Sequence, residues 1–80
     1  MNGKVYVQVD GRFTAEGQIL PQMVYWEDGR RFVIDAVTDI RPAASLKAGG
    51  AGIRYRVRIG GRETYLFLEE NRWFVEARRF

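Results

Sequence analysis

The chain contains no cysteine and no histidine among its 80 residues. These absences exclude disulfides and thiolate metal sites, and they remove the most common metal ligand and general base. The sequence also lacks a run of the ~20 apolar residues that a membrane helix needs, and its first residues do not resemble a signal peptide. We therefore expect a complete, soluble, cytoplasmic protein that holds no metal or other cofactor and does not enter a membrane.

The length indicates one small domain spanning residues 1–80, near the lower limit of what folds unaided. Such a chain depends on dense apolar packing or on oligomerisation, and eleven aromatic residues (two Trp, four Tyr, five Phe) favour packing. The net charge of +3 is unevenly spread: residues 1–40 carry four basic and six acidic side chains, and residues 41–80 carry nine and four. This asymmetry predicts either a basic surface that faces an anionic partner, or neutralisation within the fold or across a dimer.

Alternating apolar and polar residues, separated by turn residues, predict an all-β protein. Six strands are expected: Lys4–Asp10, Met23–Trp26 with residues 19–21 leading into it, Arg31–Val37, Gly52–Ile59, Arg62–Glu69 and Trp73–Arg78. The expected turns lie at Asp10-Gly11, Asp28-Gly29, Gly60-Gly61 and Glu70-Asn71. One short helical turn is expected over Pro42–Lys47, within the Pro42–Gly52 loop. The pattern favours a small antiparallel six-stranded barrel of the SH3-like type, with an OB-like barrel or a sandwich as the alternative.

The strongest local pattern is Ile53–Ile59, in which apolar residues alternate with arginines, followed by Gly60-Gly61. Paired glycines supply the positive φ angles of a two-residue hairpin turn. Two-residue turns on both sides of Arg62–Glu69 predict these facing pairs: Arg58 with Glu63, Arg56 with Tyr65, Arg54 with Phe67, Phe67 with Phe74, Tyr65 with Glu76, and Glu63 with Arg78. The opposite face is the predicted core: Ile53, Tyr55, Val57, Ile59, Thr64, Leu66, Leu68, Trp73, Val75 and Ala77, with Val5, Val7, Val9, Phe32 and Ile34 from partner strands.

The predicted outer face combines basic and aromatic side chains: Arg54, Arg56, Arg58 and Arg78 with Tyr65, Phe67 and Phe74. Faces of this kind hold single-stranded nucleic acid in small barrels, because arginines contact phosphates and rings stack on bases. An acidic protein surface is the other partner that such a face suits. Glu63 and Glu76 favour a different interpretation, in which arginines stack on neighbouring rings and the face is solvated or packs against a second copy as a homodimer.

No catalytic residue is predicted. Asp28, Asp35 and Asp39 lack a paired histidine or a second clustered carboxylate at ligand spacing. The glycine-rich residues 49–52 follow a lysine, but they lack the spacing of a phosphate-binding loop and precede a strand instead of a helix. Trp26 and Trp73 are expected in the core or at the barrel ends. The sequence therefore predicts a non-enzymatic binding module.

Residues 26–37 (WEDGRRFVIDAV), the later Arg41 and residues 72–76 (RWFVE) resemble a group of small uncharacterised bacterial all-β proteins. Their pattern is W-x-x-G-R-x-[YF]-x-[VI]-x-x-V, an arginine-bearing loop, and two strands that end in a tryptophan strand. The resemblance covers about two thirds of the chain. Some of these proteins are associated with translesion-type DNA polymerase homologues, so the resemblance implies an accessory role in DNA repair. It supplies no functional residues to transfer.

Overall fold

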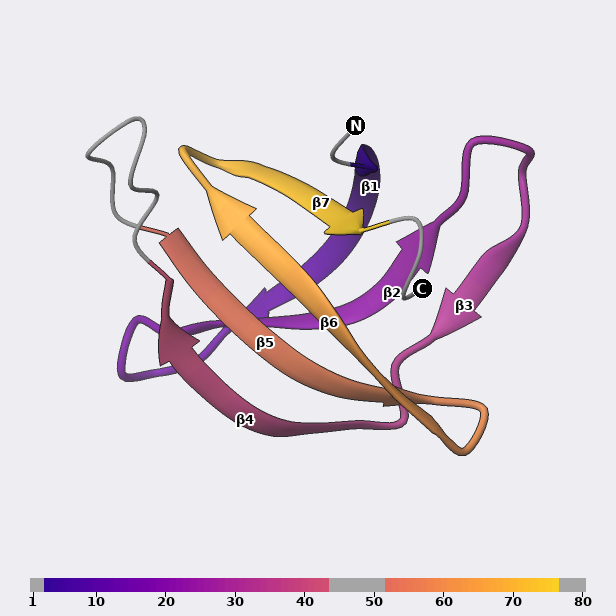
Figure 1. Ribbon diagram of the computed structural model, residues 1–80. Coiled ribbons are helices and arrows are strands. Elements are labelled where there is room, and N and C mark those ends of the chain that lie inside the picture. The colour runs from indigo at the N-terminus through magenta and orange to yellow at the C-terminus, as the bar shows by residue number, and fades with distance from the viewer. Residues whose placement is uncertain (1–2, 44–51, 77–80) are drawn as a thin grey trace.

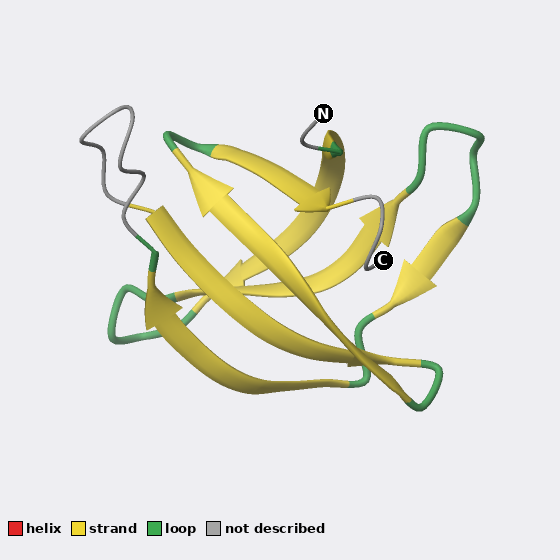
Figure 2. Cartoon of the chain, in the orientation of Figure 1, coloured by secondary structure: helices red, strands yellow, loops and turns green. Residues whose placement is uncertain are grey.

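The computed structural model describes residues 3–43 and 52–76, and every regular element within them is a strand. In chain order these are β1 (Lys4–Phe13), β2 (Ile19–Tyr25), β3 (Arg31–Val33), β4 (Ala36–Pro42), β5 (Gly52–Ile59), β6 (Arg62–Glu69) and β7 (Arg72–Glu76). They form one antiparallel sheet in the order β3-β2-β1-β7-β6-β5-β4. The sheet curls into a half-barrel (Figures 1 and 2). The described residues include no helix that could cross a membrane.

A two-residue link between β3 and β4 ties the two ends of the sheet together. The Ile34 N–H donates to the Gln22 carbonyl on β2 at 3.0 Å, and the next N–H, from Asp35, donates to the Arg58 carbonyl on β5 at 2.8 Å. The Asp35 carboxylate also accepts the Gly60 N–H at 2.9 Å. These two consecutive amides thus bond to β2 and β5, which lie near opposite ends of the sheet. The link therefore holds the sheet in its curled shape.

The concave face encloses the core. The cluster at its centre consists of completely buried side chains, Val24, Tyr55, Val57, Leu66 and Val75, and Pro21 of β2 is completely buried as well. The Tyr55 hydroxyl crosses the interior and donates to the Ile19 carbonyl on β2 at 2.7 Å, while its ring lies 5.4 Å from that of Trp73. Tyr55 therefore satisfies its one polar group inside the core.

The predicted register of the last two hairpins is confirmed where the structure describes it. Gly60 and Gly61 both have positive φ (58° and 83°), and Arg58, Arg56 and Arg54 face the expected partners on β6. Glu70 and Asn71 form the second two-residue turn, again with positive φ (52° and 65°), and Phe67 faces Phe74. The pairs expected with residues beyond 76, including Arg78, lie outside the described residues.

Three local predictions were wrong. The expected strand Arg31–Val37 is divided in two by the link at residues 34–35, so the structure has seven strands instead of six. Asp10-Gly11 is not a turn, because β1 continues through it to Phe13 with a shift of register against β2. Pro42 is the last residue of β4 instead of the start of a helical turn. The remainder of the expected turn, residues 44–47, lies outside the described residues.

The predicted core is largely confirmed, but it was incomplete: Pro21, Val37 and Ile40 also belong to it, and two further residues differ from expectation. Val24 was not predicted to be buried, although it faces Phe32 across the β2–β3 pair and has no exposed surface. Phe74 was expected on the exposed outer face, yet only 8% of it is exposed. Its neighbours on that face cover it, as described below. The expected core residue Ala77 lies outside the described part of the chain.

Candidate nucleic-acid interface

The convex outer face carries a continuous row of side chains that crosses five strands. Each member lies opposite the next on a neighbouring strand. In the order β1, β7, β6, β5 and β4 they are Tyr6, Phe74, Phe67, Arg54 and Arg41. Residues directly opposite on neighbouring strands are close enough for their side chains to interact. The row therefore joins an aromatic surface over β1, β7 and β6 to a basic surface over β5 and β4.

The aromatic part of the row is packed on itself. Phe67 and Phe74 stack face to face, with centroids 4.9 Å apart and rings inclined by 6°. Tyr6 meets Phe74 edge-on at 5.8 Å, and the Lys4 ammonium lies 4.4 Å from the centre of the Phe74 ring. These contacts bury Phe74 on the outer side of the sheet. Tyr6, which is 45% exposed, is the accessible ring at this end of the row.

Three arginines of the outer face lie against neutral groups. Arg54 lies 4.8 Å from the centre of the Tyr65 ring, and Arg72 lies 3.7 Å from the centre of the Tyr6 ring. Arg56 donates from Nε to the Thr38 hydroxyl at 3.1 Å. Within the described residues none of the three forms an ion pair. In the part of the chain that the structure describes, no contacting carboxylate neutralises these charges, although Asp39 faces Arg56 across the β4–β5 pair and its pKa is lowered in part by that arginine.

Other cations of this face are paired. Arg58 lies 3.7 Å from a Glu63 oxygen, and Lys4 lies 3.8 Å from a Glu69 oxygen. Arg41 donates to the Asp39 carboxylate at 2.7 Å, and this hydrogen bond is the main reason that the pKa of Asp39 lies below its ordinary value. These exposed pairs contribute little to stability, but they reduce the local positive charge.

Toward β2 the outer face carries a carboxylate, that of Asp10. The Tyr25 hydroxyl donates to the Asp10 carboxylate at 2.6 Å, and this hydrogen bond raises the pKa of Tyr25. This end of the outer face thus carries a hydrogen-bonded carboxylate, whereas Arg54, Arg56 and Arg72 over β5–β7 form no ion pair with another described residue. Arg31 faces Tyr25 across the β2–β3 pair and its positive charge opposes the rise in the pKa of Tyr25, so both signs of charge occur at this end of the sheet.

The structure brings six of the seven predicted site residues onto one face: Arg54, Arg56, Arg58, Tyr65, Phe67 and Phe74. The seventh, Arg78, lies outside the described residues. Sequence reasoning missed Tyr6 and Arg72, which join the face because β1 pairs with β7. The alternation of Lys4–Asp10 does place Tyr6 on the polar side of its strand, but it does not say which strand lies beside it.

The described residues contain no group of three His, Cys, Asp or Glu side chains that could hold a metal ion. No protein-family model, no curated protein and no solved structure matches the chain. Function must therefore be inferred from the geometry and charge of the surface itself.

Proposed function

We propose that the protein is a non-enzymatic binding module that holds single-stranded nucleic acid on the outer face of β1, β7, β6 and β5. The observation that carries this proposal is the placement of Arg54 and Arg72 over tyrosine rings, with no ion pair to a carboxylate among residues 3–43 and 52–76. A guanidinium on a ring can contact a phosphate through its N–H groups and can also offer its plane to a base.

The buried stack of Phe67 and Phe74 sets a limit on how bases bind. These rings already stack on each other. Bases would therefore stack on the two tyrosine–arginine pairs of the outer face, Tyr6–Arg72 and Tyr65–Arg54. Phosphates would be contacted by those two arginines and by Arg56. Three phosphate contacts on a single strand correspond to a log–log salt slope of about −2.

The test is binding of a labelled single-stranded oligonucleotide, measured by fluorescence anisotropy over a range of salt concentrations. The double variant R54Q/R72Q should flatten the slope by about 1.4, since two contacts are lost at about 0.7 each. The matched control is R12Q/R31Q, which removes the same charge from exposed positions on β1 and β3. We expect the control to keep most of the affinity.

Two further variants separate charge from stacking. Lysines at positions 54 and 72 keep the charge but remove the planar group, so R54K/R72K should retain the salt slope and lose affinity. Tyr6→Leu should weaken binding by about 1–3 kcal/mol if a base stacks there. Equal losses in R54Q/R72Q and R12Q/R31Q would show that only net charge matters, and no binding to DNA or RNA at low salt would exclude the proposal.

A self-associating protein, or one that binds an acidic protein surface, is the second candidate. The exposed Tyr6 beside Phe74 favours self-association, because a C2 dimer would cover this aromatic surface. Light scattering distinguishes the two: a dimer that dissociates in Tyr6→Leu, together with no oligonucleotide binding, would favour self-association.

The fold type, the cellular location and the biological role are also proposals. We infer that the curled sheet is a variant of the SH3-like small barrel, because it has the short length, hairpin order and tight turns of that class. Cysteine-free composition suits the cytoplasm, and the resemblance described above suggests a DNA-repair accessory. Oligonucleotides that carry a primer–template junction are therefore the first substrates to compare with plain single strands.

A further inference from the structure

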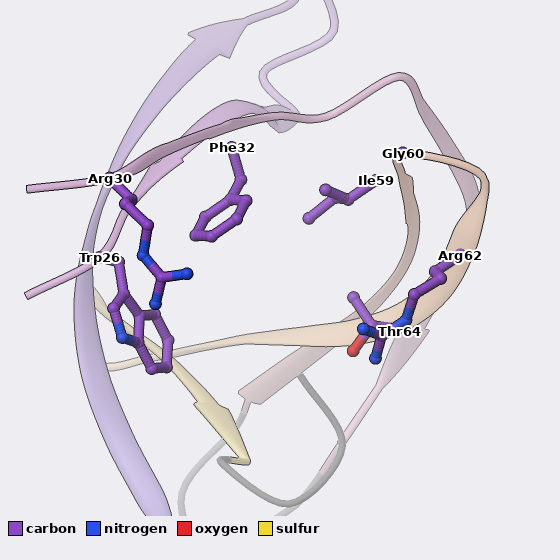
Figure 3. A pocket seen from close by; sticks show the side chains of 7 residues that line it. All are labelled: Trp26, Arg30, Phe32, Ile59, Gly60, Arg62 and Thr64. Carbon is purple, nitrogen blue, oxygen red and sulfur yellow. The ribbon is translucent and has the colours of Figure 1, made fainter. Parts of the chain in front are cut away.

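The concave interior opens into a cavity of about 400 Å³ at one end of the half-barrel (Figure 3). Its described lining consists of Trp26, Arg30, Phe32, Ile59, Gly60, Arg62 and Thr64. Trp26, Arg62 and Thr64 each interact with another residue, and Arg30 forms an ion pair with Asp28. Every described lining side chain that has a polar group is therefore already engaged within the protein.

A second pocket, of about 420 Å³, opens at the point where β1 parts from β7. β1 pairs with β7 over residues 4–7 and with β2 over residues 8–13, and the turn between β6 and β7 lies beside this change of partner. The volume falls within the range of small-ligand sites. The described lining of this pocket consists of Tyr6, Val7, Gln8, Val9, Asn71, Arg72 and Trp73.

Alternation places the polar lining residues side by side on the outer face. Because Tyr6 faces Phe74, Gln8 is the next outer position along β1 and Arg72 the next along β7. The Arg72 guanidinium lies in contact with the Tyr6 ring, 3.7 Å from its centre. Asn71 precedes Arg72 in the turn, and all four residues are exposed. The Tyr6–Arg72 pair, on which we expect a base to stack, thus has two carboxamides beside it.

The carboxamides of Gln8 and Asn71 are available to a ligand. Among residues 3–43 and 52–76, neither takes part in a side-chain hydrogen bond. A carboxamide carries both donors and acceptors, whereas a phosphate only accepts. The two amides are therefore best matched by a ligand whose edge also carries both kinds of group, as the edge of a nucleobase does.

The charges around the two amides also favour a neutral group over a phosphate. Asp10 is the next outer position along β1, and Glu70 precedes the second amide in the turn. Arg72 is the cation of the described lining, and Arg31, which faces Tyr25 on the neighbouring strand, is the other nearby cation. Two carboxylates and two guanidiniums leave no net positive charge here. A phosphate is therefore attracted to Arg72 itself and not to the amides beside it.

We propose that this pocket holds one base of the bound strand and selects adenine. This inference rests on the proposed function and names the base preferred at its Tyr6–Arg72 end. A base that stacks on the plane of Arg72 does not meet the N–H groups of that guanidinium with its edge, so Gln8 and Asn71 contact the edge instead. Carboxamides pair bidentately with the amino group and ring nitrogen of adenine, whereas guanine presents two acceptors there and suits arginine.

The experiment compares labelled single-stranded thymidine heptamers whose central base is T, A, C or G, by fluorescence anisotropy. Central adenine should bind about fivefold or more tightly than central thymine, since one bidentate pair discriminates by at least that factor. The salt slope should be equal for all four, because their phosphates are identical. Gln8→Leu and Asn71→Gly should each reduce the preference and keep binding of the all-thymidine heptamer; glycine suits the positive φ at position 71. The matched control is Gln18→Leu, an exposed glutamine before β2, which should keep the preference.

Failure of this inference differs from failure of the proposed function. Equal binding of all four heptamers would overturn the adenine preference and leave the nucleic-acid proposal standing, whereas no binding of any heptamer would overturn both. A preference for guanine or cytosine, a preference unchanged in both amide variants, or an equal loss for all four heptamers in those variants would overturn the assignment of the two amides as base readers. Adenosine monophosphate that binds as tightly as the adenine heptamer would assign the pocket to a free nucleotide instead of a strand.

Discussion

The substitution Tyr55→Phe tests how the two sides of the half-barrel are held together. It removes the hydroxyl that donates to the Ile19 carbonyl at 2.7 Å, and it leaves the ring in contact with Trp73. A net hydrogen bond contributes about 0.5–1.5 kcal/mol, and a buried acceptor left without a donor costs about 1–3 kcal/mol. Because Ile19 is only half-buried and water can reach it, we expect a loss of about 1–2 kcal/mol. For a domain of this size that loss lowers Tm by roughly 4–16 °C.

The same variant predicts a change in pH dependence. Burial raises the pKa of Tyr55 above its ordinary value of 10.0, so the unfolded chain releases this proton at a lower pH than the folded protein. Stability from this group is therefore complete below pH 10 and falls as pH rises toward the folded pKa, by up to about 1.4 kcal/mol per pH unit. The Tyr55→Phe variant lacks this loss of stability. Tyr25, whose pKa is also raised, is present in both proteins, so its contribution to the pH dependence cancels when the two are compared.

Urea unfolding followed by circular dichroism, at pH values from about 7 to 11, measures both effects. The stability difference between wild type and Tyr55→Phe should be constant up to about pH 9 and should then narrow. Equal stability at neutral pH would refute the role given to the cross-barrel hydrogen bond. A difference that stays constant through pH 11 would show that the Tyr55 proton is not retained by burial.

Two other changes act on stability. Replacing Glu70-Asn71 by Asn-Gly should stabilise the protein by about 1 kcal/mol and raise Tm by roughly 4–8 °C, because both residues have positive φ, which glutamate adopts at a cost; unchanged thermal unfolding would contradict this. Asp35→Ala should destabilise by about 1–2 kcal/mol through loss of the bond from the Gly60 N–H. Glu63→Gln is its control, since it removes only an exposed ion pair and should change the urea midpoint little.

The sequence allowed the hairpins to be predicted because their determinants are local. In Ile53–Glu76, strict alternation assigns each side chain to a face, and two-residue turns at Gly60-Gly61 and Glu70-Asn71 fix which residues are opposite. Once the turn length is known, no distant contact is needed to set the register. The basic–aromatic face over β5, β6 and β7 was therefore predictable in detail.

Features that depend on distant contacts were not predictable. The exposure of Phe74 could not be judged, because Tyr6 and Lys4 reach it only through the β1–β7 pairing, almost seventy residues apart in the chain. Asp10-Gly11 has the composition of a turn, yet the strand continues because Gly11 lies close to Ile19, where an added Cβ would be 3.1 Å from its side chain. There, glycine serves close packing between strands instead of reversing the chain.

The β5–β6 hairpin contributes both to the proposed nucleic-acid surface and to the core because each strand has two faces. On its outer face, Arg54 rests on Tyr65 and joins the aromatic row, while on its inner face Tyr55 and Leu66 fill the core. Near the turn the core ends before the strands do, and the exposed Arg62 occupies an inward position there, at the edge of the cavity. Alternation therefore places basic and aromatic side chains on the outer face of this hairpin and apolar side chains on its inner face.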